Sequence, residues 1–149
     1  MSEQYTNVYA KCRHATGMTQ EAFAEAVGIS VESIKAYELF RRLPPNAVVV
    51  QMVAVSGQDW LALKHLEMTS EGLDVLPHAD VKSLPLASIR LINKVMAFAD
   101  RHRDRQLLTI AEDGRIDEAE RPLFASILRD LEELTSAALE VRFYDKGCE

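Results

Sequence analysis

The N-terminal third of the sequence gathers side chains whose chemistry suits the recognition of a polyanion and of base edges. The ammonium group of Lys35 can donate to guanine O6 and N7, the carboxylate of Glu32 can accept from cytosine N4, and Val31 can contact a thymine methyl group. Phosphate oxygens can be bound by three further side chains, Gln20, Arg41 and Arg42. On a helix surface the same residues can also form nothing more than a solvated face, so their meaning depends on the elements that position them.

A first short helix is predicted from Gln20 to Val27. Thr19 precedes it and has a hydroxyl that can accept a backbone N–H, which suits an N-cap. Apolar residues then recur three and four apart on one face, at Phe23, Ala24 and Val27. Gly28 can adopt a positive φ and close this helix.

A second short helix is predicted from Val31 to Phe40, with Ser30 as its N-cap. Ile34 and Tyr37 belong to its inner face. The outward face then consists of Val31, Glu32, Ser33, Lys35 and Ala36. Two helices joined by a few residues around a glycine form a helix-turn-helix unit, and this unit would hold the recognition side chains in place.

This stretch resembles the helix-turn-helix of lambda-repressor-like (XRE family) DNA-binding proteins. That family has Gln at the start of the first helix, a small residue four positions on, Gly eight positions on, then Ile or Val and a Ser or Thr cap. The residues at those places here are Gln20, Ala24, Gly28, Ile29, Ser30 and Ile34. The resemblance covers about residues 5–66. It implies a five-helix domain whose second motif helix faces the major groove of double-stranded DNA, in a regulator of transcription.

The DNA-binding residues expected from the pattern and the resemblance are Gln20, Ser30, Val31, Glu32, Ser33, Lys35, Ala36, Arg41 and Arg42. Val31 and Glu32 stand where the family often has Arg, Ser or Gln. The alternative is therefore a helix-turn-helix fold that no longer reads DNA and binds another protein, as an antitoxin or an adaptor. A positive ridge around Lys35 and the two arginines favours DNA, whereas a neutral apolar patch favours a protein partner.

The composition is that of an ordinary soluble chain, with 149 residues, 48% of them hydrophobic, and a net charge of −6. Residues 1–67 hold six Lys/Arg and seven Asp/Glu, so a basic face there must come from local clustering. The two cysteines, Cys12 and Cys148, offer no disulfide framework. No apolar run suggests a signal peptide or a membrane span, and we expect a cytoplasmic protein without membrane contact.

We expect an all-α protein organised as a DNA-binding domain (1–67), a connecting segment (68–84) and a C-terminal helical hairpin (85–149). The other helices of the first domain are expected at Ser2–Ala15, Asn46–Ser56 and Trp60–Glu67, the last of them capped by Asp59. The run 47–55 is rich in valine, which favours strands. We nevertheless expect helix there, because the run follows Pro45, stops at Gly57 and has no partner strand.

The helical pattern resumes at Leu86, and a polar patch at 100–106 marks either a solvated stretch or a bend near His102. Gly114 is the expected C-cap. A capping box of Asp117 and Glu120 would begin a last helix, Glu118–Phe143. Its apolar stripe consists of Leu123, Ile127, Leu131, Leu134, Ala138 and Val141. We expect a homodimer that buries part of this stripe or part of the face from Leu86 to Ala99.

Nothing in the sequence predicts an enzyme, a cofactor or a metal centre. The four histidines, His14, His65, His78 and His102, lie far apart and none has a Cys or carboxylate neighbour at metal-ligand spacing. No Gly-rich phosphate loop or nucleophile motif occurs. Residues 113–120 resemble the second half of an EF-hand loop, but Thr109 and Ala111 stand where oxygen ligands are required.

We therefore predict that the loop at 113–120 binds no calcium at physiological concentration. Calorimetric titration is the measurement. Micromolar calcium binding that is abolished by Glu120→Gln would overturn this prediction, because a ligating carboxylate at that position would then be required.

Overall fold

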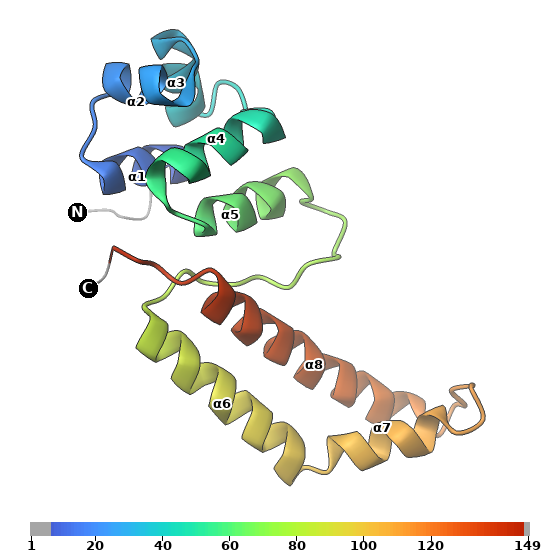
Figure 1. Ribbon diagram of the computed structural model, residues 1–149. Helices are drawn as coiled ribbons and strands as arrows, with labels where there is room; N and C mark the ends of the chain where they lie inside the picture. The colour runs from blue at the N-terminus through green and yellow to red at the C-terminus, as the bar shows by residue number, and fades with distance from the viewer. Residues whose placement is uncertain (1–6, 148–149) are drawn as a thin grey trace. The chain divides into compact units, whose positions relative to one another are not determined.

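The computed structural model describes residues 7–147, and those residues contain eight helices and no strand (Figure 1). The helices are α1 (Val8–Thr16), α2 (Gln20–Val27), α3 (Val31–Glu38), α4 (Asn46–Ser56), α5 (Trp60–Thr69), α6 (Leu84–Asp100), α7 (Arg103–Ala111) and α8 (Arg121–Arg142). The predicted all-α class is confirmed. No helix of the described part is long and apolar enough to cross a membrane.

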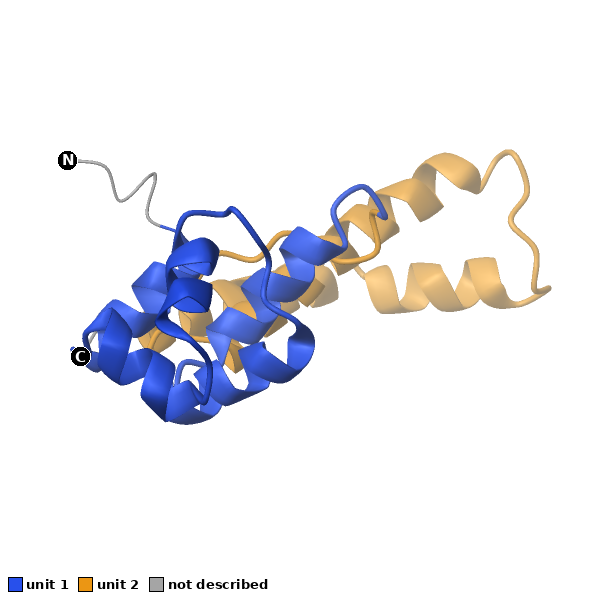
Figure 2. Cartoon of the chain, turned by 90° about the horizontal axis from the view of Figure 1, so that it is seen from above, with its two compact units in different colours: residues 1–73, 149 blue, residues 74–148 orange. Residues whose placement is uncertain are grey.

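The chain divides into two compact units, which Figure 2 shows in different colours. Unit 1 ends at Leu73 and contains α1 to α5, and unit 2 begins at Asp74 and contains α6 to α8. The division falls inside the segment 68–84 that was expected to be a connection. The beginning of that segment belongs to α5, which runs to Thr69.

The core of unit 1 is built from the inward faces of all its helices. Its fully buried side chains include Tyr9, Cys12, Phe23, Ile34, Met52, Trp60 and Leu61. The valine-rich run is the helix α4, as predicted from its flanks: it follows Pro45 and is closed by Gly57, whose φ is 69°. Only Val49 and Met52 of this helix are buried, because one side of it faces solvent.

A polar cluster extends from this core to the surface, with Tyr9 and His65 buried and Asn46 exposed. The Tyr9 hydroxyl is 2.7 Å from His65 Nδ1, and His65 Nε2 is 3.1 Å from Asn46 Oδ1. Burial raises the pKa of Tyr9 to about 12 and lowers the pKa of His65. The hydrogen bonds link α1, α4 and α5 and satisfy polar groups that would otherwise destabilise the core.

Several helix ends and one cap in unit 1 differ from the expectation. The first helix was expected from Ser2, but α1 begins at Val8 because the Asn7 side chain accepts the N–H groups of Tyr9 and Ala10; residues 2–6 lie outside the described part. The second motif helix was expected to reach Phe40 but ends at Glu38, since Phe40 adopts a φ of 52°. Asp59 precedes α5 with no side-chain cap hydrogen bond.

Unit 2 is a helical hairpin with one interruption. α6 and α8 lie side by side, and α7 follows α6 after a break at Arg101–His102 (Figure 1). His102 has a φ of 55°, so the chain leaves the helix there, and of the two alternatives drawn from the polar patch the bend near His102 is confirmed and the continuous solvated helix is excluded. α7 ends at Ala111, three residues before Gly114, which has a φ of 72° in the following turn.

The predicted capping box is confirmed. The Glu120 N–H donates to Asp117 Oδ1 over 2.9 Å, and the Asp117 N–H donates to Glu120 Oε2 over 3.1 Å. The three residues after Asp117 form turns, so regular helix begins at Arg121 rather than at Glu118. Of the expected apolar stripe, Ile127 is fully buried, whereas Ala138 is exposed.

The chain before α6 packs on α8 through a buried carboxylate. Glu140, whose side chain is 2% exposed, accepts from the Asp80 N–H (3.1 Å) and from Lys82 Nζ (3.0 Å) with Oε1. Its Oε2 lies 3.0 Å from Arg90 Nη1, an ion pair outside hydrogen-bond alignment. Burial raises the pKa of Glu140, but Lys82, the Asp80 N–H and Arg90 outweigh it and hold that pKa below its usual value. One side chain thus joins three parts of unit 2.

The turn between α2 and α3 generates a prediction. Gly28 has a φ of 84°, as expected, and an added Cβ there would meet no atom within 4 Å. Gly28→Val should therefore destabilise unit 1 by more than ~1 kcal/mol through backbone strain alone, because β-branched residues are strained at positive φ.

Urea unfolding followed by the fluorescence of Trp60 measures this, since Trp60 is the only tryptophan and lies in the core of unit 1. Ala26→Val, at an exposed position of α2 with helical backbone, is the matched control and should change stability by only a fraction of that amount. Equal stability of wild type and Gly28→Val would refute the prediction.

Candidate nucleic-acid interface

The turn of the helix-turn-helix is fixed by three sets of local hydrogen bonds. The Thr19 hydroxyl accepts the Ala22 N–H (3.2 Å) at the start of α2. At its end, the N–H groups of Gly28 and Ile29 both donate to the Ala24 carbonyl, over 2.9 and 3.0 Å. The Ser30 hydroxyl then accepts the Ser33 N–H over 3.2 Å and begins α3. These bonds satisfy backbone groups at both helix ends and so define where α3 starts.

The angle between the motif helices is held by a network around Glu38, near the C-terminus of α3. Arg13 of α1 donates to Glu38 through Nε (2.5 Å) and Nη2 (3.1 Å). Gln20, the first residue of α2, donates to Glu38 Oε2 through Nε2 over 2.8 Å. Arg13 also donates to the Met18 carbonyl over 2.9 Å. The network joins α1, α2 and α3 where they meet.

The Glu38 carboxylate is held in its charged form. Burial raises the pKa of Glu38. The hydrogen bonds from Arg13 and Gln20 and the charge of Arg13 lower this pKa by more than burial raises it, so the net shift is downward. The pKa of Arg13 is raised, mainly by its hydrogen bond to Glu38. Both side chains are almost completely buried, at 11% and 8% exposure, so the pair depends on being intact: removing one partner leaves the other charge uncompensated.

The outward face of α3 is solvent-accessible as expected. Glu32 and Lys35 are exposed, while Val31, Ser33 and Ala36 are half-buried at its edges. Ile34 and Tyr37, at 1% and 4% exposure, belong to the core of unit 1. The hydroxyls of Ser30 and Ser33 lie 3.0 Å apart and are engaged with each other at the helix start.

Arg42 lies along α3 rather than in open solvent. Its guanidinium carbon is 5.2 Å from the centre of the Tyr37 ring, and its Nη2 donates to the Ser33 hydroxyl over 2.8 Å. The chain reverses after α3 because Phe40 has a positive φ and the Arg41 N–H donates to the Ala36 carbonyl over 2.9 Å. This reversal brings the two arginines back to the helix that carries Lys35.

The nine sequence-predicted residues thus fall into two groups. Those of the first group belong to α3 and its cap or, as Arg41 and Arg42, to the loop directly after α3, and Arg42 packs on the Ser33 and Tyr37 side of the helix. Gln20 is different: its side-chain amide is committed to Glu38, which leaves its backbone N–H at the start of α2 as the donor available to a phosphate. Three exposed apolar side chains border the arginines, Leu39, Phe40 and Leu43.

Sequence reasoning missed Glu38 and the packing of Arg42. Arg13 and Glu38 are 25 positions apart, so no local spacing signals their pairing. The arginine-on-tyrosine contact depends on the backbone reversal at Phe40, a residue type that rarely adopts positive φ.

No cluster of three or more His, Cys, Asp or Glu side chains suited to a metal ion occurs among residues 7–147. In the loop after α7, Asp113 Oδ1 accepts the Arg115 N–H over 2.9 Å, while Asp117 and Glu120 are occupied by the capping box. These carboxylates serve local backbone groups.

Comparison with known proteins gives no relative: no family model, no curated protein and no solved structure matches the chain.

The Glu38 network generates a prediction. Glu38→Gln should lower the free energy of unfolding of unit 1 by about 1–3 kcal/mol at neutral pH, since it leaves the Arg13 charge buried without a counter-charge. Because the folded protein lowers the Glu38 pKa, the carboxylate stabilises the fold above its ordinary pKa of 4.5, and this stabilisation is lost as the pH falls through the folded value.

Urea titrations followed by Trp60 fluorescence at neutral and acidic pH test this. The stability difference between wild type and Glu38→Gln should shrink towards low pH. Glu25→Gln, at an exposed position of α2, removes the same charge and should change little at any pH. A difference that stays constant with pH would contradict the role given to the carboxylate charge.

Proposed function

We propose that this protein is a sequence-specific DNA-binding regulator of transcription that acts in the cytoplasm as a homodimer and reads the major groove with the outward face of α3. The observation that carries the proposal is the surface formed by α3 and the loop after it. There, Glu32 and Lys35 are exposed on a helix that its N-cap and the Glu38 network hold in place, and two exposed arginines follow it, of which Arg42 packs along the Ser33 and Tyr37 side of the same helix.

The chemistry of this face matches base and phosphate recognition. Lys35 and Glu32 are one donor and one acceptor on adjacent turns, suited to guanine and cytosine edges. Arg41 and Arg42 follow directly at the C-terminal end of α3 and supply phosphate contacts. Few cations are involved, so the phosphate contribution is small and one copy binds weakly. Two copies related by a two-fold axis would read half-sites about one helical turn, or ~34 Å, apart.

The second candidate function is binding to another protein through the same region. The observation that favours it is the exposure of Leu39, Phe40 and Leu43 beside the arginines. A groove on the partner that accepts these side chains would bury an apolar surface that monomeric proteins seldom leave open. The DNA proposal predicts that these residues matter little for affinity, whereas the protein-partner candidate makes them essential.

Selection from a random DNA library, followed by gel-shift titration at about 50 and 100 mM salt, tests the proposal. We expect enrichment of a short inverted repeat, with a shallow salt dependence because few phosphates are neutralised. If no sequence is enriched and affinity stays in the non-specific range, the DNA proposal fails and the protein-partner candidate replaces it.

Substitutions on this surface should have separable effects. Lys35→Ala should relax base preference by ~1–3 kcal/mol at one position of the half-site. Arg41→Ala combined with Arg42→Ala should weaken binding to all sequences alike and reduce the salt dependence. Arg105→Ala combined with Arg129→Ala, at exposed positions of unit 2, removes the same charge as a control and should leave both properties unchanged. Equal losses from the two double variants would show that net charge alone drives binding.

A further inference from the structure

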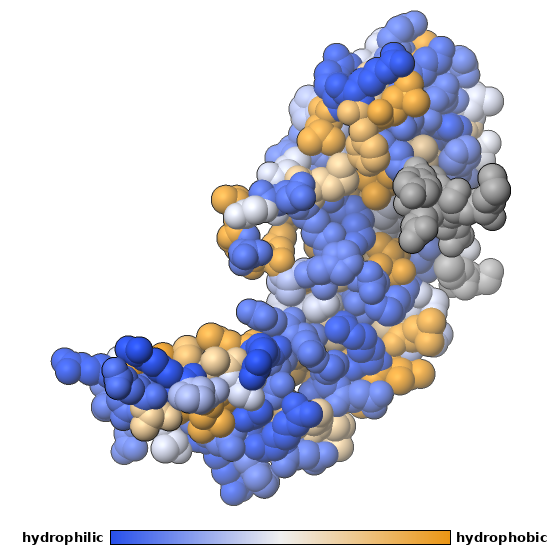
Figure 3. Space-filling view, turned by 180° about the vertical axis from the view of Figure 1, so that it is seen from behind, coloured by the Kyte–Doolittle hydropathy of each residue, from blue (hydrophilic) through white to orange (hydrophobic). Residues whose placement is uncertain are grey.

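The outer side of α6 is an exposed apolar stripe. Its side chains are Leu86, Ile89, Ile92, Val95 and Met96, and three of them, Ile89, Ile92 and Met96, are 59%, 59% and 56% exposed. Their spacing of three and four residues places these three on one face of the helix. Figure 3 shows hydrophobic surface along the edge of unit 2 that α6 forms. We call these five residues the α6 stripe.

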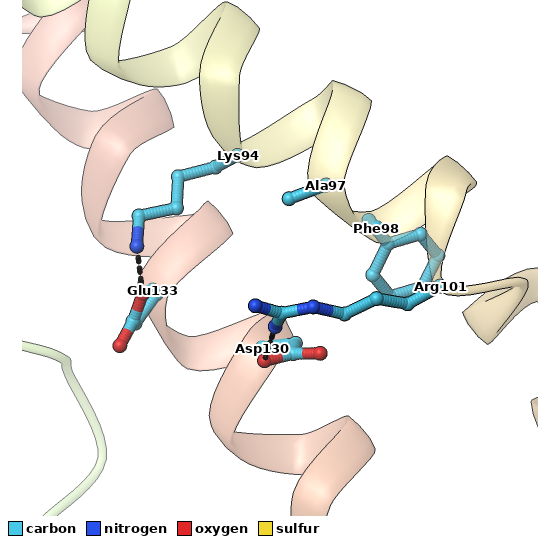
Figure 4. A pocket seen from close by; sticks show the side chains of 6 residues that line it. All are labelled: Lys94, Ala97, Phe98, Arg101, Asp130 and Glu133. Carbon is cyan, nitrogen blue, oxygen red and sulfur yellow. Dashed lines mark hydrogen bonds and ion pairs between the residues drawn. The ribbon is translucent and has the colours of Figure 1, made fainter.

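The opposite side of α6 carries the charges. Arg90 pairs with Glu140, Lys94 with Glu133, and Arg101 with Asp130, all on α8. Figure 4 shows Lys94 and Arg101 reaching from α6 to their carboxylates on α8. Between Leu84 and Ala99 the only charged residues are Arg90 and Lys94, so the α6 stripe contains no charge at all. Unit 2 has an apolar core as well, because Ala87 of α6 and Ile127 and Ala137 of α8 are completely buried, but the larger apolar side chains of α6 remain outside it.

The size of the α6 stripe sets what can cover it. Five side chains with this exposure present on the order of 500 Å², near the upper end of the about 300–600 Å² found for the largest apolar patch of a monomeric protein. If two such surfaces cover each other completely, they remove about 1,000 Å² from water, which is the lower limit for a specific interface and fits a dimer of micromolar affinity.

We infer that the α6 stripe is the homodimer interface, and that α6 packs against α6 of a second copy in antiparallel orientation around a two-fold axis at Ile92. We assign a second copy because a two-fold contact at the α6 stripe keeps the net charge of −6 carried by each copy outside the contact. The α6 stripe is free of charge, and a two-fold contact places it against the identical surface.

The antiparallel orientation follows from the register. With the axis at Ile92, Ile92 meets its own counterpart and Ile89 faces Val95 of the second copy, so apolar residues meet at the centre of the contact. Asp100 at the C-terminal end of α6 then approaches the N-terminal end of the partner helix, where the helix dipole favours negative charge. A parallel pair would instead bring the two Asp100 carboxylates together.

This inference deepens the proposed function, since it names the surface that would pair two DNA-reading helices, but its test does not depend on DNA. Sedimentation or light scattering of the full chain should show a dimer in the micromolar range. Ile89→Glu combined with Ile92→Glu should raise the dimer dissociation constant by about 100-fold or more, because two charges per copy would be buried without partners.

The matched control is Leu73→Glu combined with Leu108→Glu. These side chains are even more exposed, at 68% and 73%, and lie outside α6, so this variant should remain a dimer. Circular dichroism should show unchanged helix content in both variants. A monomeric wild type at high micromolar concentration, or an Ile89/Ile92 variant that stays dimeric, would overturn the inference.

Disulfide trapping tests the register, in a Cys148→Ser background. Ile92→Cys lies on the two-fold axis and should be trapped as a covalent dimer. In the Ile89→Cys variant the two thiols would be about 9 Å apart along the helices, so it should not crosslink. Equal crosslinking at both positions would indicate a parallel pair and refute the antiparallel arrangement.

The DNA selection experiment distinguishes a failure of the proposed DNA-binding function from a failure of the proposed dimer interface. If the dimer forms through the α6 stripe but no DNA sequence is enriched, the proposed function fails and the inference stands. If DNA is bound specifically while the Ile89/Ile92 variant remains dimeric, the inference fails and the proposed function stands.

Discussion

The arrangement of the candidate interface depends on one buried carboxylate. Glu38 receives donors from α1 and α2 while it belongs to α3, so three helices converge on two oxygen atoms. Short helices of eight or nine residues gain little stability from their own backbone hydrogen bonds. Their packing therefore decides their orientation, and the directional bonds to Glu38 restrict it to one angle. The buried Glu38 carboxylate thus determines how the exposed face of α3 is oriented.

In unit 2 a buried carboxylate, that of Glu140, likewise joins several segments of the chain. There the carboxylate holds the segment before α6, α6 itself and α8 together, and its charge is balanced by Lys82 and Arg90. The consequence differs, however. With the cations of α6 turned towards α8, the large apolar side chains of the α6 stripe are left on the outside, although Ala87 of the same helix is buried. The rotation of α6 about its own axis therefore determines both its ion pairs with α8 and the exposure of the α6 stripe.

Much of the fold followed from local signals. Thr19, Gly28 and Ser30 marked the ends of α2 and α3 because caps and positive-φ glycines act over a few residues, and Pro45 with Gly57 overrode the strand propensity of the valines. The failures were also physical. The start of α1 depended on a cap by Asn7, and the reversal at Phe40 required a bulky residue at positive φ. Long-range partners such as Arg13 and Glu38, or Lys82 and Glu140, leave no periodic trace in the sequence.

In α3, the residues that pack against the core differ from the residues that are exposed. This separation affects how easily the exposed surface can change in evolution. Ile34, Tyr37 and Glu38 make the contacts of the helix with the rest of unit 1, whereas Glu32 and Lys35 make none that the core depends on. Exposed helix positions of this kind tolerate most substitutions with changes within about 0.5 kcal/mol. The surface can therefore drift through many side-chain combinations at nearly constant stability. Selection or engineering could retarget such a scaffold without first having to rescue its fold.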